Sequence, residues 1–202
     1  MDRKRCEAVL RKASRTSNGL LRTAELLRAG LHPRDLYALR DAGELEVVSR
    51  GIYRFADAPP LADPDLVTVA ARVPKAVVAL ISALHFHRLT SEIPHEVSFA
   101  LPKGTARPKL EWPPVRVYWF SGSMYDSGIE VHERDGVKVR VYEPAKTIAD
   151  CFRFRNRIGT DVALDALRTA LVEHRLTPAQ IVRAARSARV ETIVRPYLEA
   201  MQ

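Results

Sequence analysis

Cysteine and long hydrophobic runs are both scarce in this chain of 202 residues. Its two cysteines, Cys6 and Cys151, lie far apart, which argues against a disulfide framework and leaves too few thiols for a zinc site. The longest apolar run, residues 76–84 with Ser82 inside it, is too short to span a bilayer. Residues 1–5 are charged and no apolar segment follows them, so we expect no signal peptide, no membrane partner and a cytoplasmic location.

The sequence also lacks internal repeats and low-complexity segments. Apolar residues make up 47% and charged residues 28%, which is typical of a globular protein. The net charge is +8, and a basic balance favours an anionic partner, most often nucleic acid. Residues 1–58 contain twelve Lys and Arg against eight Asp and Glu, so they carry half of this net charge.

The first 57 residues predict several short helices followed by a β-hairpin. Helices are expected over residues 5–15, from Thr23 to a stop at Gly30, and over residues 33–42, where Pro33 suits the first turn. Residues 45–49 and 52–55 are β-rich, and the two residues between them fit a tight turn. This order of elements is the plan of a winged helix-turn-helix, in which the second helix of the pair enters the major groove.

The third helix and the hairpin supply the candidate DNA contacts. With Leu36 and Leu39 turned inward, the outer face of the helix carries two arginines and a tyrosine. An arginine can bond guanine with two donors, and one at the wing tip can enter a narrow minor groove. The predicted DNA-binding residues are Arg34, Tyr37, Arg40, Arg50, Tyr53 and Arg54. The alternative for each is ordinary: exposed arginines are often only solvated, and Tyr53 can cap the core.

A proline-rich stretch separates this region from the rest of the chain. Three prolines fall within residues 56–65, and we predict a winged helix-turn-helix domain over 1–57, a linker over 58–64 and a second domain over 65–202. The second segment predicts helices near 66–72 and 82–89, strands at 97–101 and 115–120, a hairpin over 129–142, and helices from Pro144 onward. Thr177 and Gln180 form the pattern of a capping box. The predicted class is α+β, with a mixed α/β second domain.

Two runs of residues resemble the AbiEi family of antitoxins. These are Arg50-Gly51-Ile52-Tyr53-Arg54, preceded by spaced leucines, and Glu143-Pro144-Ala145-Lys146-Thr147-Ile148-Ala149-Asp150. The resemblance implies a transcriptional autorepressor that binds inverted repeats in its own promoter. It also implies protection against a cognate nucleotidyltransferase-like toxin, which we assign to the second domain. No catalytic residue, cofactor-binding residue or metal ligand is expected.

Two other functions stay open on the sequence. Gly122-Ser123 followed by Glu133 and Asp135 superficially resembles a nucleotidyltransferase signature, so a nucleic-acid-processing or nucleotidyltransferase-like enzyme is the main alternative. The Arg between the two carboxylates is a poor fit to a magnesium site. The second alternative is a partner-binding module with a degenerate winged helix. Lys146 and Asp150 lie one helical turn apart, and we interpret them as a surface ion pair.

Overall fold

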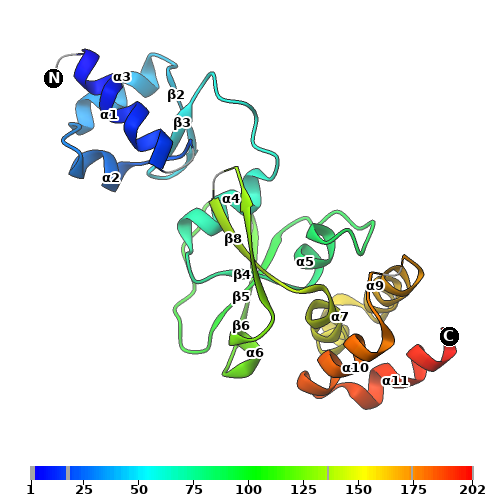
Figure 1. Cartoon of the computed structure of the whole chain (residues 1–202). Helices are drawn as coiled ribbons and strands as arrows, with labels where there is room; N and C mark the ends of the chain where they lie inside the picture. Colours follow the sequence, from blue (N-terminus) through cyan, green and yellow to red (C-terminus); the bar gives the residue numbers. More distant parts are fainter. Residues whose placement is uncertain (1–2, 17–18, 136, 174, 202) are drawn as a thin grey trace. The chain divides into compact units, whose positions relative to one another are not determined.

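The computed structural model describes residues 3–16, 19–135, 137–173 and 175–201, and it contains two compact units (Figure 1). The first unit comprises residues up to Ala71 together with Glu133–Lys138, and the second comprises Arg72–His132 and the chain from Val139 onward. The predicted α+β class is confirmed, since helices and strands occur in both units. The units divide at different residues from the predicted linker over 58–64.

The first unit opens with three helices, α1 (Arg3–Thr16), α2 (Thr23–Arg28) and α3 (Pro33–Asp41). Gly30 ends the α2 turn with a φ of +91°, a conformation that only glycine adopts at low cost. The helices pack through a small apolar core with the strands that follow them. Its buried members are Leu10, Leu21, Leu26, Leu31, Leu36, Leu45 and Tyr53.

A three-stranded sheet completes the helix-turn-helix region. Its strands are β1 (Leu21–Arg22), β2 (Leu45–Ser49) and β3 (Ile52–Phe55), in the order β1-β3-β2. Both pairings are antiparallel, and the register of β2 against β3 shifts between Val47 and Ser49. The predicted turn is present at Arg50-Gly51, where Gly51 has a φ of +78°. This hairpin is the wing.

The first unit extends beyond the wing. Helix α4 (Pro64–Arg72) and Val137 join Leu20 and Ile52 in a second apolar cluster, which also contains Val67 and Ala71. Hydrogen bonds reinforce it, because an Arg22 guanidinium nitrogen donates to the carbonyl of Ala71 over 2.9 Å. The predicted linker is therefore followed by a helix that belongs to the same core as the wing.

In its described residues the second unit has a five-stranded sheet in the order β6-β5-β4-β8-β7. Strands β5 and β6 are parallel, β4 and β5 are antiparallel, and β4 and β8 are parallel. The bounds are β4 (Val77–Val78), β5 (Val97–Pro102), β6 (Val115–Phe120), β7 (Ile129–Arg134) and β8 (Val137–Tyr142). The last two strands form the predicted hairpin, whose tip belongs to the first unit.

Helices pack with this sheet around the main apolar core. They are α5 (Leu80–Phe86), α6 (Ser123–Asp126), α7 (Pro144–Arg153), α8 (Arg155–Ile158), α9 (Thr160–Val172), α10 (Pro178–Ser187) and α11 (Glu191–Ala200). Helix α7 is buried continuously from Ala145 to Phe152, so it is the central helix of the unit. Cys151 lies on it as a free, buried thiol, whereas the side chain of Cys6 lies outside the described residues. No helix in the described part is long and apolar enough to cross a membrane.

Candidate nucleic-acid interface

Helix α3 begins at a well-defined cap. His32 is the N-cap residue, with extended backbone angles, and its Nδ1 accepts a hydrogen bond from the backbone N–H of Arg34 over 3.2 Å. Pro33 occupies the first helical position, where a missing N–H leaves no bond unmade. Leu36 is fully buried and fixes the inner face of the helix. The sequence placed the start of this helix correctly at Pro33.

The outer face of α3 carries the cations that the sequence predicted. Arg34, Tyr37 and Arg40 are all exposed, and Tyr37 has 47% of its surface open to solvent. The Arg40 guanidinium lies 2.7 Å from a carboxylate oxygen of Asp41 and 5.1 Å from the centre of the Tyr37 ring. The hydrogen bond from Arg40 to Asp41 raises the pKa of Arg40 above its usual value. Arg40 is thus held in a defined position by its neighbours while it stays open to a ligand.

The wing presents Arg50 at its tip. Arg50 is exposed and occupies the first position of the turn. The carbonyl of Gly51 accepts from the backbone N–H of Thr23 over 2.9 Å, so the tip is tied to the start of α2. This hydrogen bond anchors the part of the backbone that carries the exposed guanidinium. The structure therefore places Arg34, Tyr37, Arg40 and Arg50 on the surface of the first unit, on two neighbouring elements of the fold.

Two predicted contact residues lie elsewhere. Tyr53 is 6% exposed and belongs to the apolar core, so its ring packs instead of reaching outward. Arg54 donates through Nε to a Glu46 carboxylate oxygen over 2.9 Å, and its other nitrogens reach the carbonyls of Pro59 over 2.7 Å and Ala58 over 3.3 Å. These donors are committed within the unit, and the side chain is 12% exposed. Tyr53 and Arg54 follow each other on β3 and point to opposite faces, one into the core and the other onto Glu46 and the chain at Ala58 and Pro59.

One carboxylate of the enzyme alternative, that of Asp135, has a structural role. Asp135 Oδ2 accepts from the backbone N–H groups of Ala62 and Asp63, over 3.0 and 3.4 Å. This carboxylate holds the segment before α4 against the hairpin tip. Within the described ranges, no group of three or more His, Cys, Asp and Glu side chains is placed to hold a metal ion.

The ion pair between Lys146 and Asp150 is present, but it is not on the surface. The Lys146 Nζ lies 2.6 Å from Asp150 Oδ2, and the two side chains are only 10% and 2% exposed. The spacing predicted the contact correctly, since residues four apart on a helix face each other. The surface assignment was wrong because α10 and other elements of the second unit cover this part of α7.

Comparison with known proteins supports the reading of the first unit. Residues 7–56 match the family model of the AbiEi antitoxin transcriptional regulators, which confirms the resemblance inferred from the spaced leucines and the Arg50–Arg54 run. A crystal structure of the RV2827C protein from Mycobacterium tuberculosis is similar to the chain with a TM-score of 0.53 and 13% sequence identity. That likeness covers 98% of this chain and 82% of the other, and it shows a shared fold. A search of curated proteins gives no match.

Proposed function

We propose that this chain, whose first unit carries an AbiEi antitoxin domain, represses transcription by binding double-stranded DNA at inverted repeats in its own promoter. We further propose that it counteracts a nucleotidyltransferase-like toxin as the antitoxin of the pair, without catalysing a reaction itself. The observation that carries the DNA-binding proposal is the set of exposed cations on α3 and on the wing tip, in a domain of a regulator family.

The position of each cation suits a different contact. In helix-turn-helix proteins the N-terminal residues of the recognition helix reach base edges, and Arg34 is the second residue of α3. Arg40 is fixed by Asp41 and Tyr37, so less side-chain freedom is lost when it binds. Arg50 lies at the wing tip, from which a guanidinium can enter the minor groove or meet a phosphate. Inverted repeats would be read by two copies of the chain, one for each half-site.

A binding titration against the chain's own promoter tests this proposal. Affinity is measured by fluorescence anisotropy over a series of salt concentrations, for the wild type and for Arg34→Ala, Arg40→Ala and Arg50→Ala. Loss of one phosphate contact reduces the slope of log K against log salt by about 0.9, and loss of a base contact weakens specific binding by roughly 1–3 kcal/mol.

A matched control distinguishes the loss of a DNA contact from the loss of one positive charge. Arg168 is exposed on α9 of the second unit, so Arg168→Ala removes the same charge from a surface outside the proposed interface. This variant is expected to keep wild-type affinity and salt slope. If all three first-unit variants behave like Arg168→Ala, α3 and the wing do not form the interface.

The antitoxin proposal needs a separate experiment. The chain is co-expressed with the toxin-like protein encoded next to it, and growth is scored in cells that depend on protection. A doubly substituted chain, Arg40→Ala with Arg50→Ala, is expected to lose repression of a promoter fusion and to keep protection, because protection is assigned to the second unit. If the folded double variant loses protection as well as repression, the assignment of protection to the second unit is contradicted.

A further inference from the structure

Both tryptophans of this chain are exposed, and both lie in one part of the second unit. Trp112 is 64% exposed and belongs to the long connection between β5 and β6, residues 103–114, whereas Trp119 is 43% exposed near the end of β6. Large aromatic side chains usually bury most of their surface, so two indoles left open to solvent point to a binding surface. The proposed DNA-binding site lies in the first unit and does not use these residues.

The connection runs back along the two parallel strands that it joins. At its start the backbone N–H of Lys103 donates to the carbonyl of Phe120 over 2.7 Å, and at its end the carbonyl of Pro114 accepts from the first residue of β5 over 2.8 Å. Trp119 Nε1 donates to the carbonyl of Thr105 over 2.8 Å. This bond places the connection beside Trp119 and holds the indole ring in one orientation.

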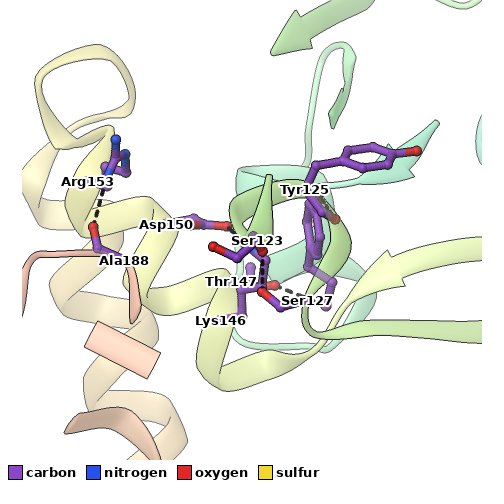
Figure 2. Close-up of polar contacts among 9 residues, drawn as sticks. Ser123, Tyr125, Ser127, Lys146, Thr147, Asp150, Arg153 and Ala188 are labelled. Atoms are coloured by element: carbon purple, nitrogen blue, oxygen red, sulfur yellow. Dashed lines mark hydrogen bonds and ion pairs between the residues drawn. The ribbon is translucent and has the colours of Figure 1, made fainter. Parts of the chain in front are cut away.

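The other face of the sheet is covered by helices. The residues that flank Trp119 along β6 point to that face and belong to the main core. Figure 2 shows part of it, where α6 and α7 are bonded to β8 through Tyr142. The Tyr142 hydroxyl donates to the carbonyl of Tyr125 over 2.9 Å, and the Tyr142 carbonyl accepts from the Thr147 hydroxyl over 3.0 Å. A ligand therefore reaches Trp119 from the side of the connection.

Positive charges accompany the tryptophans. Three cations are exposed along the connection, namely Lys103, Arg107 and Lys109. In the part of the chain that the structure describes, none of these three side chains pairs with a carboxylate. Glu111 is the one acidic residue of the connection, so three cations against one carboxylate leave a net charge of +2 there. Arg116 points to the opposite face of β6 from Trp119, and its charge is balanced by Glu96 at 2.5 Å.

We propose that this surface, formed by the connection and the Trp119 side of β6, binds a single strand of RNA. Indole rings stack on unpaired bases of any sequence, and cations beside them meet the phosphates. A duplex does not offer the faces of its bases, because they are already stacked on one another. A lipid surface is also a poor fit, since the exposed residues between the two tryptophans are mostly charged or small. RNA is chosen over DNA because cells keep most of their DNA double-stranded.

The two indoles allow a direct measurement, since the chain has no other tryptophan. Tryptophan fluorescence of the full chain is titrated with an oligouridylate of about ten nucleotides, within the roughly 4–16 nucleotides that single-strand sites cover. Saturable quenching is expected, because a stacked base quenches an indole. A strand with the same backbone but without bases should bind at least about fivefold more weakly and leave the fluorescence unchanged. Duplex DNA bound at the first unit also leaves it unchanged, so the two proposals are tested separately.

Variants of exposed residues locate the site. Trp112→Phe keeps a ring for stacking and Trp112→Leu does not, so RNA affinity, followed at Trp119, should be at least about fivefold lower in the leucine variant. Arg107→Ala should reduce the slope of log K against log salt by about 0.7, as expected for one phosphate contact on a single strand. Arg168→Ala removes an exposed cation from α9 instead and should leave both affinity and slope unchanged. Glu111→Gln should strengthen binding, because it removes a like charge from the phosphates.

Four outcomes would overturn the proposal. They are an absence of quenching by oligouridylate, a strand without bases that binds as well as the RNA, a response to oligothymidylate or to anionic lipid vesicles but not to RNA, and folded Trp112→Leu and Arg107→Ala chains that bind RNA like the wild type.

Discussion

At the scale of single residues, arginines of similar sequence context have opposite roles in the first unit. Arg50 is exposed at the wing tip, whereas Arg54, four residues later, bonds Glu46 and two backbone carbonyls. Arg54→Ala is expected to lower the free energy of unfolding of the first unit by about 1–3 kcal/mol, because a charged donor network is lost and its acceptors are left unpaired. Hydrogen exchange of the β2 and β3 amides measures this loss.

Arg50→Ala is the matched comparison for that measurement. The Arg50 side chain is exposed, so Arg50→Ala should reduce amide protection in the wing less than Arg54→Ala does, and it should weaken DNA binding. A stable Arg54→Ala chain with reduced DNA affinity would restore Arg54 to the interface, as the sequence alone had suggested.

The sequence could place Arg50 but not Arg54, for a physical reason. A residue at a two-residue hairpin tip is exposed whatever the rest of the fold does. The environment of Arg54 depends on the register that sets it opposite Glu46, and on the path of the chain at Ala58 and Pro59. Neither is encoded in the local pattern around Arg54.

The buried carboxyl of Asp150 predicts a pH dependence of stability. Its pKa is raised in the folded chain, chiefly by burial, so the folded state binds its proton more tightly than the unfolded state does. The contribution of this proton to stability is complete below the unfolded pKa of the carboxyl and is lost as the pH rises through the folded value. Wild type should therefore lose stability, relative to Asp150→Asn, as the pH is raised from about 4.

Urea unfolding of both chains at a series of pH values provides the measurement. The asparagine does not titrate, so the difference between the two curves isolates Asp150 from groups common to both. A difference that changes in the opposite direction would mean that Lys146 outweighs burial at this position.

At the scale of elements, helix α10 begins with the capping box that the sequence predicted. The Thr177 hydroxyl accepts from the backbone N–H of Gln180, whose side chain accepts from the backbone N–H of Thr177. Thr177→Ala is expected to destabilise the chain by about 0.5–2 kcal/mol, and Thr177→Ser by much less, because serine keeps the capping oxygen. Thermal unfolding of the three chains compares them, and equal losses for alanine and serine would rule out the cap as the cause.

Elements with strong local signals were the ones that the sequence could predict. Strand β6 has the predicted bounds of 115–120, and helix α10 begins directly after the predicted capping residue Thr177, since alternation and capping define them locally. Strand β4 was not expected, because two valines inside an apolar run carry no period of their own. The four-residue helix α6 was also missed for lack of a repeating pattern.

At the scale of the whole molecule, the division into units is the feature that local patterns describe least well. Prolines mark the stretch over 58–64, yet the carbonyls of Ala58 and Pro59 accept from Arg54, and the amides of Ala62 and Asp63 donate to Asp135. This stretch is bonded to the first unit along its length. Composition identifies where a chain turns, but a core built from segments far apart in sequence can only be seen once the segments meet.

A pair of valines on β8 tests the division. Val137 belongs to the first unit, in the cluster with Leu20, Ile52, Val67 and Ala71, whereas Val139 belongs to the second. Both are buried, and they lie two residues apart on one strand, so they point to the same side. Each change to alanine removes two methyl groups and is expected to cost about 1–2 kcal/mol.

The readout is where amide protection falls in the full chain. Val137→Ala is expected to speed hydrogen exchange in β1, β3 and α4, because their shared apolar cluster loses a member that lies more than sixty residues away in sequence. Val139→Ala is expected to act on β4 and its neighbours instead, since β8 pairs with β4 two residues further along, at Val141. If the first unit ended at the residue before the proline-rich stretch, Val137→Ala would leave the exchange of β1 and β3 unchanged. An effect on those strands therefore distinguishes the division seen in the structure from the boundary that the prolines suggest.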